Sequence, residues 1–368
     1  MKIDTLKQRI QTMTEPRRIA YGNIRHKLED IIIIGLCTII CCGEDFNDME
    51  SFGKEREGFL RDSLHLELPN GIPDSDTFRR LFERLDPTEL SDILTDWLEA
   101  EQKGRCVVAV DGKTIRGSAS DHHKAYHVVS AFVAENQITL GELTVEEKSN
   151  EITAVPELLD MLDIEDAIIT ADAMNCQKEI VRKICEKGAD YCIALKGNQP
   201  ALQKDAEEYF RTYREEIPKK ETMEKGHGRI EKREYRLLTD ISWLEQKEEW
   251  EGLNGLGMVK RTVEKGNETT EDTRYFITSL TDIEEFADSV RKHWSIENQL
   301  HWCLDVIFRE DAARAKKDHS PRNMNVLRKT ALSLLNKAKQ NRLSKKKMMF
   351  KAALNPDVLL SVLFHGKK

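Results

Sequence analysis

The sequence lacks the apolar segments that mark membrane and secreted proteins. Its apolar run, Ile31–Cys42, is broken only by Gly35 and Thr38 and is shorter than the roughly 20 residues that a membrane-spanning helix needs. No signal-type apolar segment with a small-residue cleavage site follows the positive charges near the start. We therefore expect Ile31–Cys42 to be a buried helix, the protein to be cytoplasmic, and no membrane to be involved.

The sequence also lacks the cysteine spacing of a zinc site. Eight cysteines are present, and none forms a CxxC pair. Cys37, Cys41 and Cys42 fall on the apolar run, which suits thiols packed in a core and disfavours zinc. There is no low-complexity tract, and 39% hydrophobic with 33% charged residues indicates a globular chain. A length of 368 residues allows two or three domains.

Charge is distributed unevenly along the chain. The net charge is −8, which by itself argues against a nucleic-acid partner. Residues 309–368, however, carry 16 Lys/Arg against 4 Asp/Glu, and residues 1–30 carry 7 against 4. Basic ends around an acidic centre fit a protein that binds a polyanion and holds cations between carboxylates. A basic end that only improves solubility explains the composition equally well.

Residues 1–102 show helical patterns only, and we expect a helical N-terminal domain that binds DNA or supports a catalytic domain. Near its end, Phe78, Leu81 and Phe82 recur at helical spacing beside Arg79 and Arg80. A short capped helix with basic residues near its start fits a DNA groove. The alternative is one more core helix with a solvated face.

After residue 103 the hydrophobic pattern takes the period of strands. Three strands, a helix, a strand, a helix and a strand follow one another, which predicts a mixed α/β sheet. This succession is consistent with the RNase H arrangement, in which the fourth strand lies beside the first. The expected strands are Cys106–Asp111, His127–Asn136, Ile138–Val145, Asp166–Asp172 and Tyr191–Leu195.

Beyond residue 200 the pattern changes twice more. Residues 201–279 contain the alternating segments Arg229–Leu238, Gly257–Glu264 and Thr273–Ser279, which predict a largely antiparallel, β-rich insertion. Asp282–Asp311 has the apolar spacing of one long amphipathic helix. We assign residues 103–200 and 280–320 to one catalytic domain, and residues 321–368 to a basic helical C-terminal tail.

Two of the expected strands end in an aspartate, Asp111 and Asp172. Alone, each is more often a strand-end cap than a functional residue. If the first and fourth strands are neighbours, both carboxylates lie at one sheet edge, where sites in α/β folds gather. Glu297 on the long helix adds a third carboxylate. Such a set suits Mg²⁺, which prefers oxygen ligands, and two ions serve an in-line displacement at phosphorus.

A row of polar residues runs along the long helix at four-residue spacing: His293, Glu297, His301 and Asp305. Residues one turn apart are neighbours, so the first three share one surface, with Asp305 at its margin. We expect these partners to hydrogen-bond the metal-binding carboxylates, and His301 to orient Glu297 in particular. The alternative is a solvated helix face with intrahelical pairs.

Several blocks of the sequence together resemble the H-repeat-associated transposases, a group of bacterial insertion-sequence DDE transposases. The resemblance covers nearly the whole chain, and blocks in the right order are more specific than any one of them. The blocks are IIIIGLCTIICCGEDFNDMESFG, NGIPDSDTFRRLFERLDP, AVDGKTIRGS, EKSNEITAVPELL, ITADAMNCQKEIV, YCIALKGNQ, HGRIEKRE, YFITSL and RKHWSIENQLHWCLDVIFRED.

The resemblance implies an RNase H-like catalytic domain with a β-rich insertion before the last acid. It also implies a DDE triad that uses Mg²⁺ or Mn²⁺, in two ions, to cut and join DNA at terminal inverted repeats. Matched motif by motif, its acids fall on Asp111, Asp172 and Glu297. The implied partner is double-stranded DNA bound by a homodimer. The alternatives are a non-catalytic DNA-binding descendant and an RNase H-like nuclease without strand transfer.

The chain departs from the wider insertion-sequence-four superfamily in one respect. That superfamily surrounds its glutamate with Tyr, Arg and Lys, and those spacings fall here on Val290, His293 and Leu304. Phosphate contacts must therefore come from elsewhere. Trp294 and Trp302 are candidates to stack an unpaired base, although core packing is the favoured role of at least one. The candidates for phosphate contact are Lys113, Lys196, Arg291, His293 and Arg314, with Arg229 and Arg233 on one face of an inserted strand. An exposed strand edge explains Arg229 and Arg233 equally well.

Overall fold

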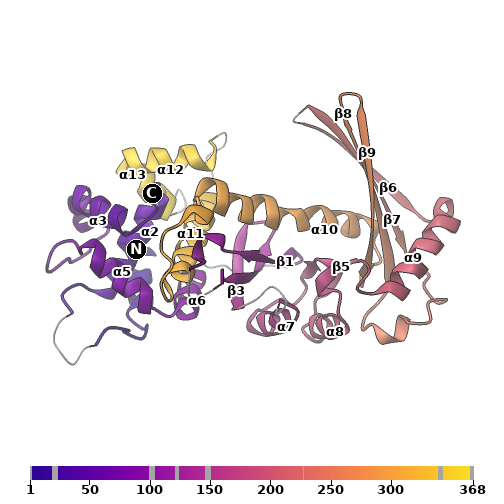
Figure 1. Ribbon diagram of the computed structural model, residues 1–368, viewed down its shortest axis with the longest axis horizontal. Helices are drawn as coiled ribbons and strands as arrows, with labels where there is room; N and C mark the ends of the chain where they lie inside the picture. Colours follow the sequence, from indigo (N-terminus) through magenta and orange to yellow (C-terminus); the bar gives the residue numbers. More distant parts are fainter. Residues whose placement is uncertain are drawn as a thin grey trace.

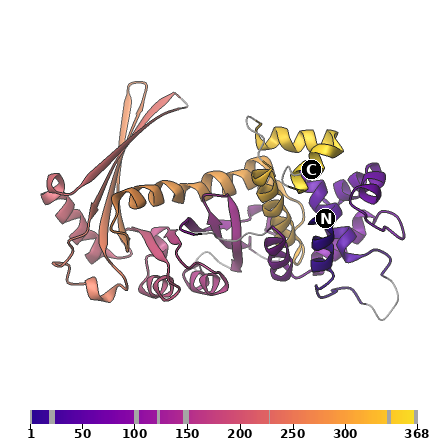
Figure 2. The same ribbon diagram turned by 180° about the vertical axis from the view of Figure 1, so that it is seen from behind.

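The structure is a computed structural model that describes residues 2–18, 24–98, 104–120, 124–145, 151–226, 228–338 and 343–364. Helices gather at one end of the molecule, a sheet fills the middle, and long β-ribbons project at the other end (Figure 1). A long helix that begins with α10 (Ile283–Ser295) runs from the ribbons to the helical end, as both views show (Figures 1 and 2).

The helical end combines two distant parts of the chain. All residues of α2, the expected apolar helix, are buried. Within the described ranges, no helix has both the length and the apolar character needed to cross a bilayer. The first part contains α1 (Lys2–Ile10), α2 (Leu28–Ile40), α3 (Phe46–Glu55), α4 (Glu57–Asp62), α5 (Ser75–Arg84) and α6 (Pro87–Trp97).

The second part of the helical end is the C-terminal segment, expected as a basic helical tail. It contains α11 (Ser320–Lys337), α12 (Lys345–Leu354) and α13 (Pro356–Leu363). Helix α11 contacts α2, α5 and α6, and Met348 and Met349 of α12 are buried in the same hydrophobic core. The described part of this segment is therefore helical and packed against the N-terminal helices.

The described strands form one nine-stranded sheet in the order β3-β2-β1-β4-β5-β9-β8-β7-β6. Strand β1 is antiparallel to β2 and parallel to β4, and β4 is parallel to β5. The fourth strand therefore lies beside the first, as the sequence predicts. The first five strands are β1 (Val107–Thr114), β2 (His127–Val133), β3 (Ile138–Val145), β4 (Ile168–Ala171) and β5 (Asp190–Leu195).

Helices cover both faces of these central strands. Helices α7 (Glu151–Met161) and α8 (Lys178–Glu186) share a buried cluster with Val108 and Ile169. Helix α10 covers the opposite face, where its side chains pack on the alternate strand residue Val107. Burial on both faces explains why these strands are nearly continuous apolar runs rather than alternating ones.

The expected β-rich insertion continues the central sheet, because β9 pairs antiparallel with β5. Strand β6 has no counterpart among the sequence expectations, since KKETMEKG contains no apolar alternation and is mostly exposed. Strand β9 also begins earlier than expected. The insertion contains α9 (Pro200–Tyr213), β6 (Lys219–Gly226), β7 (Arg229–Leu238), β8 (Gly255–Lys265) and β9 (Glu268–Thr278).

The long helix is not α-helical throughout. Asp282 caps α10 by accepting hydrogen bonds from the amides of Glu284 and Glu285, and the helix continues as two π-helical segments, Ile296–His301 and Cys303–Ile307. In an α-helix, residues four apart are offset by about 40° around the helix axis. The i→i+5 hydrogen bonds of a π-helix put more residues into each turn, which reduces this angular offset in the segment that carries Glu297.

Candidate active site

Strand register brings two carboxylates together. Val110 of β1 pairs with Ala171 of β4, so the next residues, Asp111 and Asp172, lie side by side at one edge of the parallel pair. Asp172 directly follows β4, as expected. Asp111 does not end its strand: β1 continues to Thr114 because these residues still pair with β2. The expectation that both strands end in an aspartate is therefore wrong for β1, although the shared edge is as expected.

Glu297 and His301 of the π-helical segment face Asp111. His301 Nδ1 lies 3.2 Å from Glu297 Oε2 and 3.6 Å from Asp111 Oδ2. Donor atoms of these three residues all lie within 4.8 Å of one another. The His301 ring is buried, and its Nε2 is among the buried polar atoms that lack a hydrogen-bond partner. The contact between His301 and Glu297 is the one the helix spacing predicts.

Asp172 has a histidine of its own. His293 Nε2 lies 3.7 Å from Asp172 Oδ1, and His293 Nδ1 lies 3.0 Å from the hydroxyl of Thr170 on β4. The hydroxyl orients the imidazole toward the carboxylate. His293 and His301 are two turns apart on one helix, and each contacts a different one of the two sheet aspartates.

The three carboxylates have different electrostatic environments. Burial raises the pKa of Asp111, and the charge of Asp172 adds to this effect while His301 opposes it. The neighbouring His293 imidazole lowers the pKa of Asp172, and hydrogen bonding to His301 lowers the pKa of Glu297. Carboxylates this close repel one another unless a cation lies between them. A donor set dominated by carboxylate oxygens, with one imidazole nearby, fits a hard divalent cation.

A buried polar network lies directly beneath the acids. His127 Nε2 is 3.0 Å from Glu151 Oε2, and Glu151 also accepts a hydrogen bond of 2.9 Å from Asn175. A Cβ atom on Gly112 would lie only 2.2 Å from His127 Nε2. The glycine after Asp111 therefore lets β1 pass over this network. No local sequence pattern indicates this network, because its residues come from three separate elements.

Lys113, expected to contact phosphate, is enclosed by carboxylates. Its Nζ lies 2.7 Å from Asp305 and 2.9 Å from the fully buried Glu310. Burial lowers the pKa of Lys113, but the charges of Glu310 and Asp305 outweigh this effect and raise it. Lys113 could contact a phosphate only by giving up its contact with Asp305 or Glu310. Asp305 was expected to hydrogen-bond a metal-binding carboxylate, as His301 does with Glu297, but it contacts Lys113 instead. The sequence does not single out Glu310, because it stands next to Asp311 after the long helix and no spacing distinguishes the two acids.

The other expected phosphate contacts fall into separate groups. Lys196 lines a cavity of about 190 Å³ together with Asp172 and His293, and its charge lowers the pKa of Asp172 further. Arg314 lines a different cavity, beside Arg309 and Arg328.

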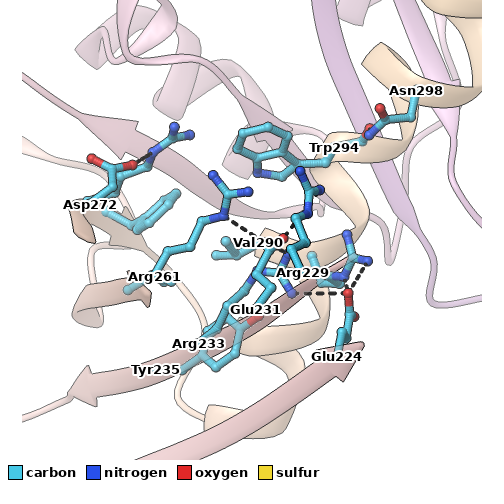
Figure 3. A pocket seen from close by; sticks show the side chains of 14 residues that line it. Glu224, Arg229, Glu231, Arg233, Tyr235, Arg261, Asp272, Val290, Trp294 and Asn298 are labelled. Carbon is cyan, nitrogen blue, oxygen red and sulfur yellow. Dashed lines mark hydrogen bonds and ion pairs between the residues drawn. The ribbon is translucent and has the colours of Figure 1, made fainter. Parts of the chain in front are cut away.

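The remaining arginines that were expected to contact DNA lie at two other positions. Arg229, Arg233 and Arg291 line a cavity next to Trp294 (Figure 3). Arg79 and Arg80 lie on α5 at the helical end, where both form ion pairs with Asp76.

Both tryptophans of the long helix are surface residues. Trp294 is 37% exposed and Trp302 is 51% exposed. The favoured role in core packing is therefore wrong for these side chains. Apolar neighbours such as Leu300 and Cys303 fill the core beneath the helix instead.

Comparison with known proteins gives matches along the chain. The family model described as "Transposase DDE domain" matches residues 102–334, and one described as "DDE_Tnp_1-associated" matches residues 7–98. A protein of Escherichia coli O157:H7 named "Putative transposase YncI" is 36% identical over 99% of this chain and 95% of its own length. The "H repeat-associated putative transposase YhhI" of Escherichia coli K12 is also 36% identical, over 99% of this chain and 98% of that protein.

Proposed function

The chain belongs to the family of DDE transposases, and on that premise we propose that it cleaves DNA at insertion-sequence ends and joins the freed 3′-OH to target DNA. The observation that carries the proposal is the convergence of Asp111, Glu297 and His301 beside Asp172. These groups come from two neighbouring parallel strands and one crossing helix. Water and a DNA hydroxyl serve as nucleophiles, so no covalent enzyme intermediate is needed.

Asp111, Asp172 and Glu297 would hold two divalent cations, Mg²⁺ or Mn²⁺. When bound, such ions activate the attacking oxygen and stabilise the leaving oxygen at phosphorus. His301 fixes the orientation of Glu297, and His293 fixes that of Asp172, as outer partners of metal ligands commonly do. Lys196 places a positive charge in the cavity beside Asp172, where the scissile strand would lie.

In this proposal, strands β1–β5 with α7, α8 and α10 form an RNase H-like catalytic domain of residues 103–200 and 280–320. The neighbouring positions of β1 and β4 support that assignment. Residues 201–279 are the β-rich insertion, residues 1–102 the helical N-terminal domain, and residues 321–368 the C-terminal part. The substrate is double-stranded DNA, bound in the cytoplasm by a homodimer through Arg79, Arg80, Lys196, Arg229, Arg233, Arg291 and Arg314.

The test uses purified protein and labelled duplexes that carry the DNA flanking its own gene. We expect cleavage that requires Mg²⁺ or Mn²⁺ and stops with EDTA, followed by joining of the labelled 3′ end to a supercoiled plasmid. Binding without cleavage would identify a DNA-binding descendant that has lost catalysis. Cleavage without joining would identify a nuclease.

A further inference from the structure

Five arginines surround one cavity beside the long helix. The cavity has a volume of about 230 Å³ and lies between strands β6–β9 and α10. Figure 3 shows side chains of the strands and of the helix around it. Three acidic residues, Glu224, Glu231 and Asp272, also line it, so the lining carries an excess of two positive charges. We call it the arginine cavity; its arginines are Arg229, Arg233, Arg261, Arg274 and Arg291.

The acidic residues hold the arginines in place. Glu231 is buried and contacts three guanidinium groups: Arg261 Nε at 2.6 Å, Arg229 at 3.5 Å, and Arg233. The hydrogen bond from Arg261 lowers the pKa of Glu231, which keeps this carboxylate charged. Glu224 links the helix to the sheet, because it binds Arg291 at 2.9 Å and also contacts Arg233.

Trp294 lies against two of the guanidinium groups, one of which, Arg261, also binds Glu231. Arg274 lies 4.9 Å from the centre of the indole ring and Arg261 lies 6.0 Å from it, distances at which cation–π attraction operates. A base could stack on that part of the ring only by displacing these cations. The arrangement therefore favours a role of Trp294 in positioning the arginines over the expected role in stacking a base.

A closed network of surface ion pairs would need about as many carboxylates as guanidinium groups. Here two positive charges are left over, and the Arg229 and Arg291 side chains are 46% and 45% exposed. Arg233 Nη1 is buried and makes no hydrogen bond, although it lies 3.4 Å from Glu224 Oε2 as an ion pair. Planar guanidinium groups bind phosphate through paired hydrogen bonds. A phosphate monoester or two adjacent phosphodiesters would neutralise the excess charge.

The arginine cavity adjoins the candidate active site. Arg274 and Trp294 line both the arginine cavity and the cavity that contains Asp172 and Lys196. Trp294 also precedes Glu297 by less than one helical turn. We infer that the arginine cavity binds a phosphate group of the DNA strand that passes through the active site. This inference rests on the proposed function for the identity of the strand, but phosphate binding is measurable without catalysis.

The experiment measures affinity of the full-length protein for two duplexes that differ only in a 5′-phosphate or a 5′-hydroxyl, in EDTA at fixed salt. Arg229→Gln should weaken binding about tenfold, the effect of losing one charge-assisted hydrogen bond. Arg182→Gln on α8 removes a somewhat more exposed arginine outside the cavity and should leave affinity unchanged.

Glu224→Gln should change the affinity for DNA in the opposite direction. It raises the excess charge of the cavity by one, so DNA should bind several-fold more tightly. Glu221→Gln removes the same charge from the same strand but lines another cavity, and should match the wild type. Weaker binding by Glu224→Gln, or equal binding by Arg229→Gln and Arg182→Gln, would overturn the inference.

The two duplexes identify the source of the phosphate. An effect of Arg229→Gln confined to the 5′-phosphorylated duplex assigns the cavity to a terminal phosphate, and equal effects on both assign it to the backbone. Because EDTA prevents cleavage, these affinities stand apart from the cleavage test of the proposed function.

Discussion

Each acid of the candidate site has a different position, yet the same role is expected of all three. Asp111→Asn, Asp172→Asn and Glu297→Gln each keep side-chain shape and remove one negative charge. We expect each to abolish metal-dependent cleavage and to leave affinity for DNA ends largely intact. Cleavage assays paired with gel-shift titrations check this. Near wild-type cleavage by one variant would remove that residue from the triad.

His301 should tune the site without being essential. Its Nδ1 lies between Glu297 and Asp111, so its loss frees both carboxylates to take other rotamers. His301→Ala should reduce cleavage about 10–100-fold, the usual effect of losing an outer partner of a metal ligand. Raising Mg²⁺ or Mn²⁺ should restore part of the rate. A metal titration of the folded variant that is identical to the wild type would end this assignment.

Loss of the Glu310 carboxylate should cost considerable stability. It is completely buried, lies 2.9 Å from Lys113 Nζ and accepts a hydrogen bond of 2.7 Å from Asn325. Despite burial, which raises it, the pKa of Glu310 is lowered because Lys113 and Arg328 favour the charged form.

Glu310→Gln removes the carboxylate that faces the buried Arg328 and leaves Lys113 with Asp305 as its near partner, so it should lower the free energy of unfolding by about 3 kcal/mol. Urea unfolding measures this. Glu249→Gln, which breaks an exposed pair with Lys178, is the control and should change stability by under about 1 kcal/mol. Equal losses in the two variants would contradict the role given to Glu310.

The candidate acids and the histidines beside them could be found from the sequence, and the long-range contacts around them could not. Asp111 and Asp172 follow apolar runs, and Glu297 and His301 are one turn apart, so local patterns reveal them. The contacts of Lys113 with Glu310, and of His127 with Glu151, join residues far apart in the chain. No local spacing encodes them, because they exist only once the turn at Glu310–Ala312 and α7 have packed against the sheet.

At the scale of elements, strands with apolar runs were predictable and polar ones were not. The central strands are buried on both faces and therefore stand out. Strand β6 forms by pairing with β7, and its exposed side chains leave no apolar period. The π-helical segments could not be predicted from the sequence either, because i→i+5 hydrogen bonding depends on how the surrounding core packs against the helix.

The cap of α10 is an element-scale device whose effect can be measured. Asp282 accepts hydrogen bonds of 2.7 and 3.0 Å from two amides of the first turn. Asp282→Ala should lower the free energy of unfolding by about 1 kcal/mol. Asp288→Ala removes an exposed acid from the middle of the same helix and should lower it by no more than about 0.5 kcal/mol. Thermal or urea unfolding compares the two, and equal losses would contradict a capping role.

At the scale of the whole molecule, the long helix joins the helical end to the β-ribbons (Figure 1). Glu297 lies on this helix, and each end of the molecule carries a group of cations. One is the arginine cavity, and the other is α12 with its exposed Lys346, Lys347 and Lys351. The basic C-terminal part cannot be tested simply by deletion, because Met348 and Met349 of the same helix are buried. Substitution of the three lysines keeps the core intact.

The triple variant Lys346→Gln, Lys347→Gln and Lys351→Gln should weaken binding to every DNA sequence alike, because phosphate contacts carry no sequence information. Each lost contact lowers the slope of log affinity against log salt by roughly 0.9, so the slope should fall by up to about 2.7. Substituting the exposed Lys178, Arg182 and Lys204 of α8 and α9 with Gln changes the net charge equally and is the control. If both variants lose the same slope, net charge alone attracts the DNA; if neither does, the lysines of α12 serve solubility. A smaller slope in the α12 variant alone places DNA across the helical end.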